Sequence, residues 1–196
     1  GLEPKTINRH FSMMKQLLRE AKSRGFAREN VIDIGLLRIP VRDREQDERI
    51  HWSSNDLQTL FSHPTWSGHR IDDRHTPGDH LTQDALYWVP ILGYYTGARR
   101  EEICGLLIDD ISCGAAIPHI LIRPNALRGL KTPQSKRAIP LHEEVLRLGF
   151  DEYVAQLKAI NRQELFPDLA PAKAESPRGE QFYNDFKPIL NKILPN

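Results

Sequence analysis

The sequence lacks the features that mark secreted and membrane proteins. Its 196 residues include two cysteines, Cys104 and Cys113, which form no C-x-x-C pair, so we expect two buried thiols in a reducing compartment. No apolar run approaches the ~18 residues that a membrane-spanning helix needs. Residues 1–5 have no signal-peptide pattern of a basic start followed by an apolar stretch. We therefore expect a cytoplasmic protein without a membrane partner.

An excess of charge of one sign is also missing. The chain has 27 basic and 26 acidic residues, for a net charge of +1. A domain that binds nucleic acid through its overall charge would be more basic. Any contact with DNA must therefore come from local clusters of Lys and Arg. The composition, 39% hydrophobic and 27% charged, fits a soluble globular protein of one domain, or one domain plus part of another.

The N-terminal segment predicts a helix followed by a linker. Thr6 is the expected N-cap and Gly25 the residue just beyond the helix. Arg9 and Lys15 are candidate DNA contacts on the polar side, although such a face is more often only solvated. Residues 36–50 are dense in charge and have no sustained apolar period, so we place a domain boundary near residue 48. The apolar face of the helix contains Ile7, Phe11, Met14, Leu18 and Ala21.

The rest of the chain predicts a mainly α fold with a small antiparallel β-sheet, an α+β class. Ser53 and Asp56 have the spacing of a capping box before a short helix. Residues 63–79 are predicted to form a long polar loop. Its neighbourhood contains His69, His75 and His80, which match no metal-ligand spacing, so no metal is expected. The other predicted elements are helices over residues 82–95 (capped by Thr82), 143–160 and 180–193, and strands over 119–122 and 137–141.

Two longer motifs carry a family resemblance. Residues 96–106 read T-G-A-R-R-E-E-I-C-G-L, and an acidic pair with an apolar residue follows at 109–111. Residues 131–141 read K-T-P-Q-S-K-R-A-I-P-L. The first string resembles the T-G-x-R signature of tyrosine recombinases, the family of phage integrases, and the second resembles the family's K-T-x-x-S-x-R-x-I-P-L hairpin. Weaker similarities to the family, in the same order along the chain, are at residues 4–10, 17–25, 52–57 and 165–167.

This resemblance covers nearly the whole chain and implies its domain organisation. Residues 1–47 would be the end of a helical core-binding domain with its linker, and residues 48–196 the N-terminal part of a catalytic domain with the tyrosine-recombinase fold. The family cuts and rejoins double-stranded DNA through a 3′-phosphotyrosine intermediate and uses no cofactor. Its members act as homotetramers on DNA.

The resemblance also assigns catalytic residues. Negative charge that develops on the phosphate must be met by cations, and a guanidinium offers paired, permanently charged donors. Arg99 occupies the arginine position of T-G-x-R, and Glu102 resembles the acid that holds this arginine in place. Lys131 resembles the lysine that gives a proton to the departing 5′ oxygen. The alternatives are a surface arginine that caps the preceding helix and a plain helix-surface glutamate.

Further cations lie close to both motifs. Arg100 follows Arg99 directly and would point roughly 100° away from it on a helix. Arg128, Lys136 and Arg137 belong to the hairpin region. Because most protein–DNA hydrogen bonds go to the backbone, we predict that the three hairpin residues contact phosphate. Arg100 is a further candidate DNA contact. A solvated turn is the alternative for the three in the hairpin.

Part of the family's catalytic set is missing from the sequence. None of the eight histidines is followed by arginine three positions later, so there is no H-x-x-R motif, and Tyr183 lies too early to be the nucleophile. We therefore expect a fragment of a recombinase that is inactive alone. Two alternatives stay open, namely a non-catalytic DNA-binding regulator derived from a recombinase and a helical interaction module.

Overall fold

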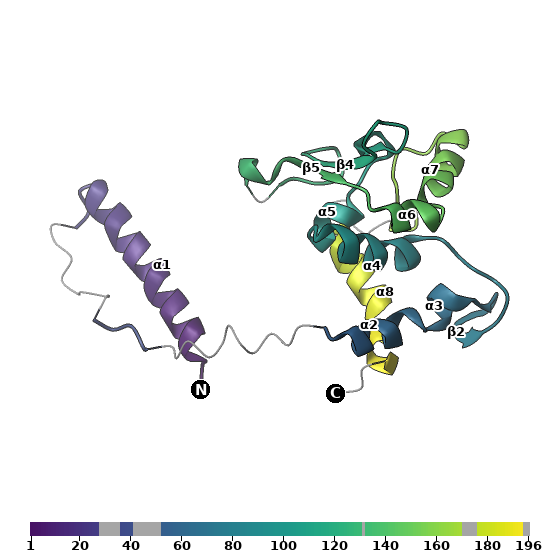
Figure 1. Ribbon diagram of the computed structural model, residues 1–196. Coiled ribbons are helices and arrows are strands. Elements are labelled where there is room, and N and C mark those ends of the chain that lie inside the picture. Colours follow the sequence, from purple (N-terminus) through teal and green to yellow (C-terminus); the bar gives the residue numbers. More distant parts are fainter. Residues whose placement is uncertain (28–35, 41–51, 131, 170–175, 194–196) are drawn as a thin grey trace. The chain divides into compact units, whose positions relative to one another are not determined.

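The computed structural model describes residues 1–27, 36–40, 52–130, 132–169 and 176–193. The chain divides into two compact units, Gly1–His51 and Trp52–Asn196, and each is described by itself (Figure 1). The domain boundary predicted near residue 48 falls within 41–51, outside the described residues. Among the helices of the described ranges, none is long and apolar enough to cross a membrane.

The first unit contains helix α1 (Pro4–Ser23). It begins earlier than predicted, with Glu3 as the N-cap instead of Thr6. Pro4 fits the first turn of a helix, because no N–H donor is needed there. Gly25 follows the helix as predicted: its φ is 76° and its N–H donates to the Lys22 carbonyl over 3.1 Å. A left-handed residue at this place therefore ends the helix.

Residues 36–40 are tied to α1 by one side chain. The Asn8 amide donates to the Ile39 carbonyl (2.8 Å) and accepts from the Ile39 N–H (3.0 Å). Although the sequence gives α1 an apolar face, no residue of α1 is buried. Arg9 and Lys15 are exposed, which is compatible with either of the two interpretations given to them.

The second unit opens with helix α2 (Ser54–Phe61), whose capping box is confirmed. The Asp56 N–H donates to Ser53 Oγ (3.1 Å), and the Ser53 N–H donates to the Asp56 carboxylate (2.8 Å). The predicted loop over 63–79 is wrong: it contains helix α3 (Pro64–Ser67) and an antiparallel pair, β1 (His69–Arg70) and β2 (Asp73–Pro77). Gly78 follows β2 and lies close to the backbone of β1. A Cβ at this position would lie 2.7 Å from the His69 carbonyl oxygen, so only glycine permits this approach.

Helix α4 (Ala85–Thr96) is the central helix of the second unit, as its apolar sequence predicts. It packs against α5 and α8, and Trp88 and Leu92 are fully buried. Its N-cap is Asp84, whose carboxylate accepts from the Tyr87 N–H, and not the predicted Thr82. The Thr82 hydroxyl is instead bonded to the His69 ring over 3.1 Å.

A three-stranded antiparallel sheet with order β3-β4-β5 follows α5 (Arg100–Cys104) and the 3-10 turn η2 (Ile108–Asp110). The strands predicted at 119–122 and 137–141 are found, with β5 one residue shorter, and Ile120 lies opposite Ile139. The two-residue strand β3 was not predicted. The elements of this sheet region are β3 (Ile111–Ser112), β4 (His119–Ile122), the turn η3 (Pro133–Ser135) and β5 (Arg137–Pro140).

The single helix predicted over 143–160 is two helices, α6 (Glu143–Arg147) and α7 (Phe150–Ala159). Gly149 separates them with a left-handed φ of 86°. The last helix is α8 (Arg178–Ile193), which runs beside α4 and α5 (Figure 1). The structure is thus a mixture of helices and small antiparallel sheets, an α+β architecture.

We expect Gly149→Ala to lower the free energy of unfolding by about 1–2 kcal/mol, because a Cβ is strained at this φ. Urea denaturation followed by circular dichroism measures the change. Gly114→Ala is the matched control, since its Cβ would meet open space and Gly114 is not among the glycines with positive φ. Equal losses in the two variants would contradict the prediction.

Candidate functional site

The carboxylate of Glu102 is the centre of the candidate site. Glu102 lies in the first turn of α5 and is 5% exposed, so the alternative of a plain helix-surface glutamate is wrong. It accepts four hydrogen bonds from two arginines. Arg99 donates its backbone N–H (2.9 Å) and Nη1 (3.0 Å), and Arg137 of β5 donates Nη1 (3.2 Å) and Nη2 (2.8 Å).

The T-G-x-R string forms the turn that delivers Arg99 to this carboxylate. Gly97 ends α4 with a left-handed φ of 61°, which favours glycine. The Thr96 hydroxyl accepts from the Ala98 N–H (3.2 Å) and stabilises the reversal. Arg99 is then the N-cap of α5. The motif therefore places Arg99 and Glu102 on the same short helix turn.

One terminal nitrogen of the Arg99 guanidinium is bonded within the protein, and most of the side chain is exposed to solvent. Its side chain is 59% exposed, although Nη1 is bonded to Glu102 and lies 3.4 Å from Ser135 Oγ. Ser135 is buried and also contacts Thr132 Oγ1 (3.1 Å). Arg99 is therefore bonded to α5 and to the η3 turn. A guanidinium restrained in this way can still present donors to a phosphate oxygen.

The hydrogen bonds between Glu102 and its arginine partners stabilise the charged forms of these side chains. The pKa of Glu102 is lowered to about 2, chiefly by the Arg137 hydrogen bond and also by the bonds from Arg99, against the opposing effect of burial. The same bond to Glu102 raises the pKa of Arg137. Glu102 is therefore a carboxylate throughout the physiological pH range.

Of the other predicted site residues in the second unit, one lies outside the described residues, two are exposed and one, Arg128, is buried. Lys131 lies outside the described residues, although its chain neighbour Thr132 is part of the turn around Ser135. Lys136 is exposed. Arg100 is exposed too, and its guanidinium carbon lies 5.0 Å from the centre of the Tyr183 ring, a cation–π contact that leaves it at the surface.

Arg128 does not fit the predicted contact with DNA phosphate. Its side chain is only 1% exposed. The guanidinium donates to the backbone carbonyls of Glu102, Leu121 (3.3 Å) and Arg123 (3.2 Å), and burial lowers the pKa of Arg128. Arg128 is therefore a structural residue that joins α5 to the end of β4.

A second buried carboxylate, Asp110, explains why Arg128 points inward. Asp110 is fully buried and lies 3.5 Å from the Arg128 guanidinium. It also accepts from Arg123 Nε (2.6 Å), Asn125 Nδ2 (2.9 Å) and the Leu107 N–H (3.1 Å). In the sequence, Asp110 stands out only as part of an acidic pair. Its need for a cationic partner was the signal that could have identified Arg128 as structural.

Glu101 has a structural task that the sequence did not indicate. Its carboxylate accepts from the backbone N–H groups of Arg178 (3.1 Å) and Gly179 (2.7 Å) at the start of α8. A negative charge is favourable at this end of a helix. A Cβ on Gly179 would lie 2.5 Å from Glu101 Oε2, so glycine permits the close approach. The two neighbouring acids of the motif therefore serve different parts of the fold.

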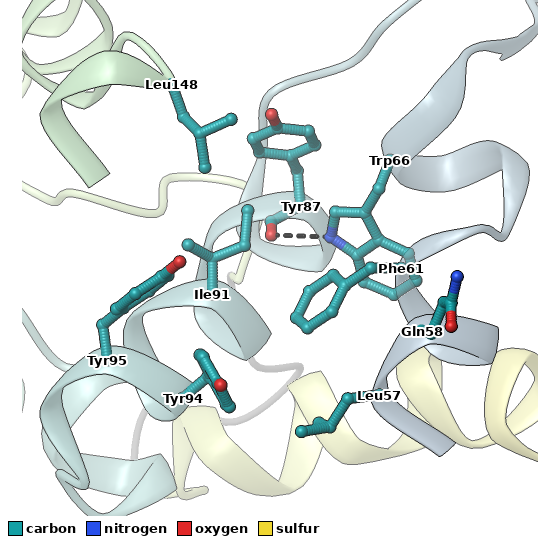
Figure 2. A pocket seen from close by; sticks show the side chains of 9 residues that line it. All are labelled: Leu57, Gln58, Phe61, Trp66, Tyr87, Ile91, Tyr94, Tyr95 and Leu148. Atoms are coloured by element: carbon teal, nitrogen blue, oxygen red, sulfur yellow. Dashed lines mark hydrogen bonds between the residues drawn. The ribbon is translucent and has the colours of Figure 1, made fainter. Parts of the chain in front are cut away.

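An aromatic pocket of about 350 Å³ lies between α2, α3 and α4, with Leu148 at its edge (Figure 2). The Trp66 indole N–H, which could have bonded a ligand, donates to the Tyr87 carbonyl (3.0 Å). None of the described residues that line the pocket is charged, so they supply no cation for a phosphate. The lining residues are Leu57, Gln58, Phe61, Trp66, Tyr87, Ile91, Tyr94, Tyr95 and Leu148.

Several of the described histidines bond within the protein, and the two cysteines lie in its core or pack against it. His69 contacts the Arg70 carbonyl (2.6 Å), and His75 Nδ1 lies 3.2 Å from His63 Nε2. Cys104 is buried as predicted, whereas Cys113 is half-buried. In the ranges that the structure describes, no three His, Cys, Asp or Glu side chains group as metal ligands.

No protein-family model, curated protein or solved structure matched this chain in the three comparisons with known proteins. The two motifs and the geometry around Glu102 are therefore the features that bear on function. The structure brings together the side chains of Arg99, Glu102 and Arg137 from these motifs. The buried Arg128 guanidinium bonds instead to backbone carbonyls, that of Glu102 among them.

Proposed function

We propose that this chain is part of a tyrosine-type site-specific recombinase, with residues 48–196 belonging to a catalytic domain of that fold. Arg99 and Lys131 would form the phosphate-handling half of its active site. The single observation that carries the proposal is the Arg99 guanidinium, which is restrained by the buried Glu102 carboxylate yet 59% exposed. Lys131 enters from the sequence motif alone.

In the proposed reaction of the parent protein, a tyrosine hydroxyl attacks a DNA phosphate and gives its proton to a base of the parent protein. The tyrosine–phosphorus bond forms and the bond to the 5′ oxygen breaks, with Lys131 donating the proton that the leaving oxygen needs. Arg99 would stabilise the charge on the non-bridging oxygens, as a preorganised donor does for an oxyanion. The nucleophile and the H-x-x-R residues would come from the parent protein, a cytoplasmic homotetramer on double-stranded DNA.

We expect Arg99→Ala to weaken binding of a fluorescein-labelled DNA duplex roughly tenfold, because one charge-assisted phosphate contact is lost. The loss should reduce the slope of log affinity against log salt concentration by about one. Fluorescence anisotropy at several salt concentrations measures both quantities.

Arg70→Ala is the matched control, because Arg70 is also 59% exposed and also has one carboxylate partner, Asp72. Its removal should leave the affinity nearly unchanged. Equal losses in both variants would show a diffuse charge effect and count against the site. An affinity that does not depend on salt, or no binding, would instead favour an interaction module.

Trapping on a nicked suicide DNA substrate separates the enzyme from a regulator. The 196-residue chain, which has no H-x-x-R motif, should give no covalent adduct. The full parent protein should give one that disappears with the Arg99→Ala change. A parent that binds DNA through Arg99 but never forms an adduct would support the non-catalytic regulator, and an adduct with the chain alone would refute its assignment as an inactive fragment.

A further inference from the structure

Two arginines share the Glu102 carboxylate in unequal ways. Arg137 grips both oxygens with its two terminal nitrogens, at 3.2 Å to Oε1 and 2.8 Å to Oε2. The Arg99 side chain donates to Oε1 alone, at 3.0 Å. A carboxylate offers about four lone-pair sites, and the Arg99 N–H takes the remaining one here. The forked bond from Arg137 therefore sets the plane of the carboxylate, and that plane sets the direction of the bond to Arg99.

Arg137 is itself held in place. Its Nη1 also donates to the Ser135 carbonyl over 2.9 Å, and its backbone lies in β5 opposite Ile122. The Ser135 hydroxyl in turn lies 3.4 Å from Arg99 Nη1. The second motif therefore reaches Arg99 in two ways, directly through Ser135 and indirectly through Arg137 and Glu102.

A direct contact between Arg137 and DNA would be costly in this arrangement. Its side chain is 35% exposed, against 59% for Arg99, and both terminal nitrogens are bonded inside the protein. Turning them toward a phosphate would remove two donors from a buried carboxylate, which is strongly unfavourable. The exposed guanidinium of Arg99 has no such restriction over most of its surface.

We infer that Arg137 is a positioning residue, which orients the Arg99 guanidinium through the shared Glu102 carboxylate and does not bind phosphate itself. The inference rests on the proposed function for its consequence in DNA binding. It replaces the role predicted for Arg137 from the sequence, and it gives the hairpin motif a task besides carrying Lys131.

Arg137→Lys distinguishes positioning from direct contact, because lysine keeps the charge but lacks the fork. If Arg137 positions Arg99, the lysine variant should bind the labelled duplex about tenfold more weakly, close to the loss in Arg99→Ala. In the Arg99→Ala background the same change should have no further effect, since coupled residues are not additive. Affinity kept by Arg137→Lys, or additive losses, would overturn the inference.

Lys136→Ala provides the additive control. Lys136 is exposed, neighbours Arg137 in the chain and has no role in the inferred coupling. Any effect of its removal on DNA affinity should be the same with and without Arg99. Thermal unfolding of each variant identifies losses of affinity that arise from a damaged fold.

A measurement without DNA keeps the inference separate from the proposed function. In NMR spectra of the free chain, Arg137→Lys should move the Arg99 Nε–Hε resonance and raise the pH at which the Glu102 carboxyl titrates. Arg70→Lys should do neither. If Arg99→Ala leaves DNA affinity unchanged while these shifts occur, the proposed function fails and the coupling stands. An unmoved Arg99 resonance in Arg137→Lys would refute the coupling.

Discussion

Arg128→Ala is expected to lower the free energy of unfolding by about 3–5 kcal/mol, the usual cost of removing one partner from a buried ion pair. The change would leave Asp110, which is fully buried, with a weaker set of cationic partners. Three backbone carbonyls, of Glu102, Leu121 and Arg123, would also lose a donor. Urea denaturation monitored by tryptophan fluorescence measures the loss.

Two further variants show which part of Arg128 matters. Arg128→Met keeps much of the side-chain volume beside Gly105, so it should be as unstable as the alanine variant if the hydrogen bonds dominate. Arg123→Ala removes the other cation on Asp110, but that side chain is 41% exposed, so we expect a smaller loss, of about 1 kcal/mol. A stable Arg128→Met variant would assign the effect to packing instead.

Glu102→Gln is expected to make the stability of the fold less dependent on pH. The pKa of Glu102 in the folded chain, about 2, lies below its ordinary value of 4.5. The folded state therefore favours the carboxylate, which stabilises the fold fully above pH 4.5, and this contribution is lost as the pH falls toward 2. The shift corresponds to about 3 kcal/mol, and with the side chain 6% exposed there is little screening by solvent.

Urea denaturation of both proteins between pH 7 and pH 2 tests this expectation. The difference in free energy of unfolding between the wild-type chain and Glu102→Gln should be largest near neutral pH and should shrink through the acidic range. Asp56 and Asp73, whose pKa values are also lowered by hydrogen bonds, titrate in both proteins and cancel in the difference. A difference that stays constant over the whole range would contradict the assignment of the shift to Glu102.

Features set by residues close in sequence were predictable. The Ser53–Asp56 capping box needs only a spacing of three, and the structure contains it. The same spacing relates Arg99 to Glu102, and their side chains meet at 3.0 Å. The α+β class followed from apolar periodicity and from two short runs of strand-like sequence. In the capping box and in the Arg99–Glu102 pair the partners are neighbours, so the distant parts of the chain did not have to be known.

Features set by distant partners were not predictable. Arg128 and Arg137 lie in the same basic stretch, and only the positions of Asp110 and Glu102 decide that one side chain is buried and the other half-exposed. Thr82 and Asp84 are both good capping residues, but the Thr82 hydroxyl is bonded to His69, which leaves Asp84 as the cap. The pattern of residues in a single sequence does not show which of two side chains has a distant hydrogen-bond partner.

Gly149 shows a different reason for error. The apolar positions around it continue a helical period, because Val145, Phe150 and Val154 all contribute to the same core. The apolar positions keep this spacing although the backbone adopts a left-handed conformation at Gly149. Core packing therefore preserved the apparent helix pattern across a break that only the glycine signalled.

The cap that Glu101 places on α8 has a consequence for folding kinetics. The bonded groups are 77 and 78 residues apart in the sequence, so the cap can form only after the intervening chain has closed into a loop. The entropy cost of closing a loop grows with its length, and contacts of long sequence separation slow folding. We therefore expect the start of α8 to gain this stabilising charge only after that loop has closed.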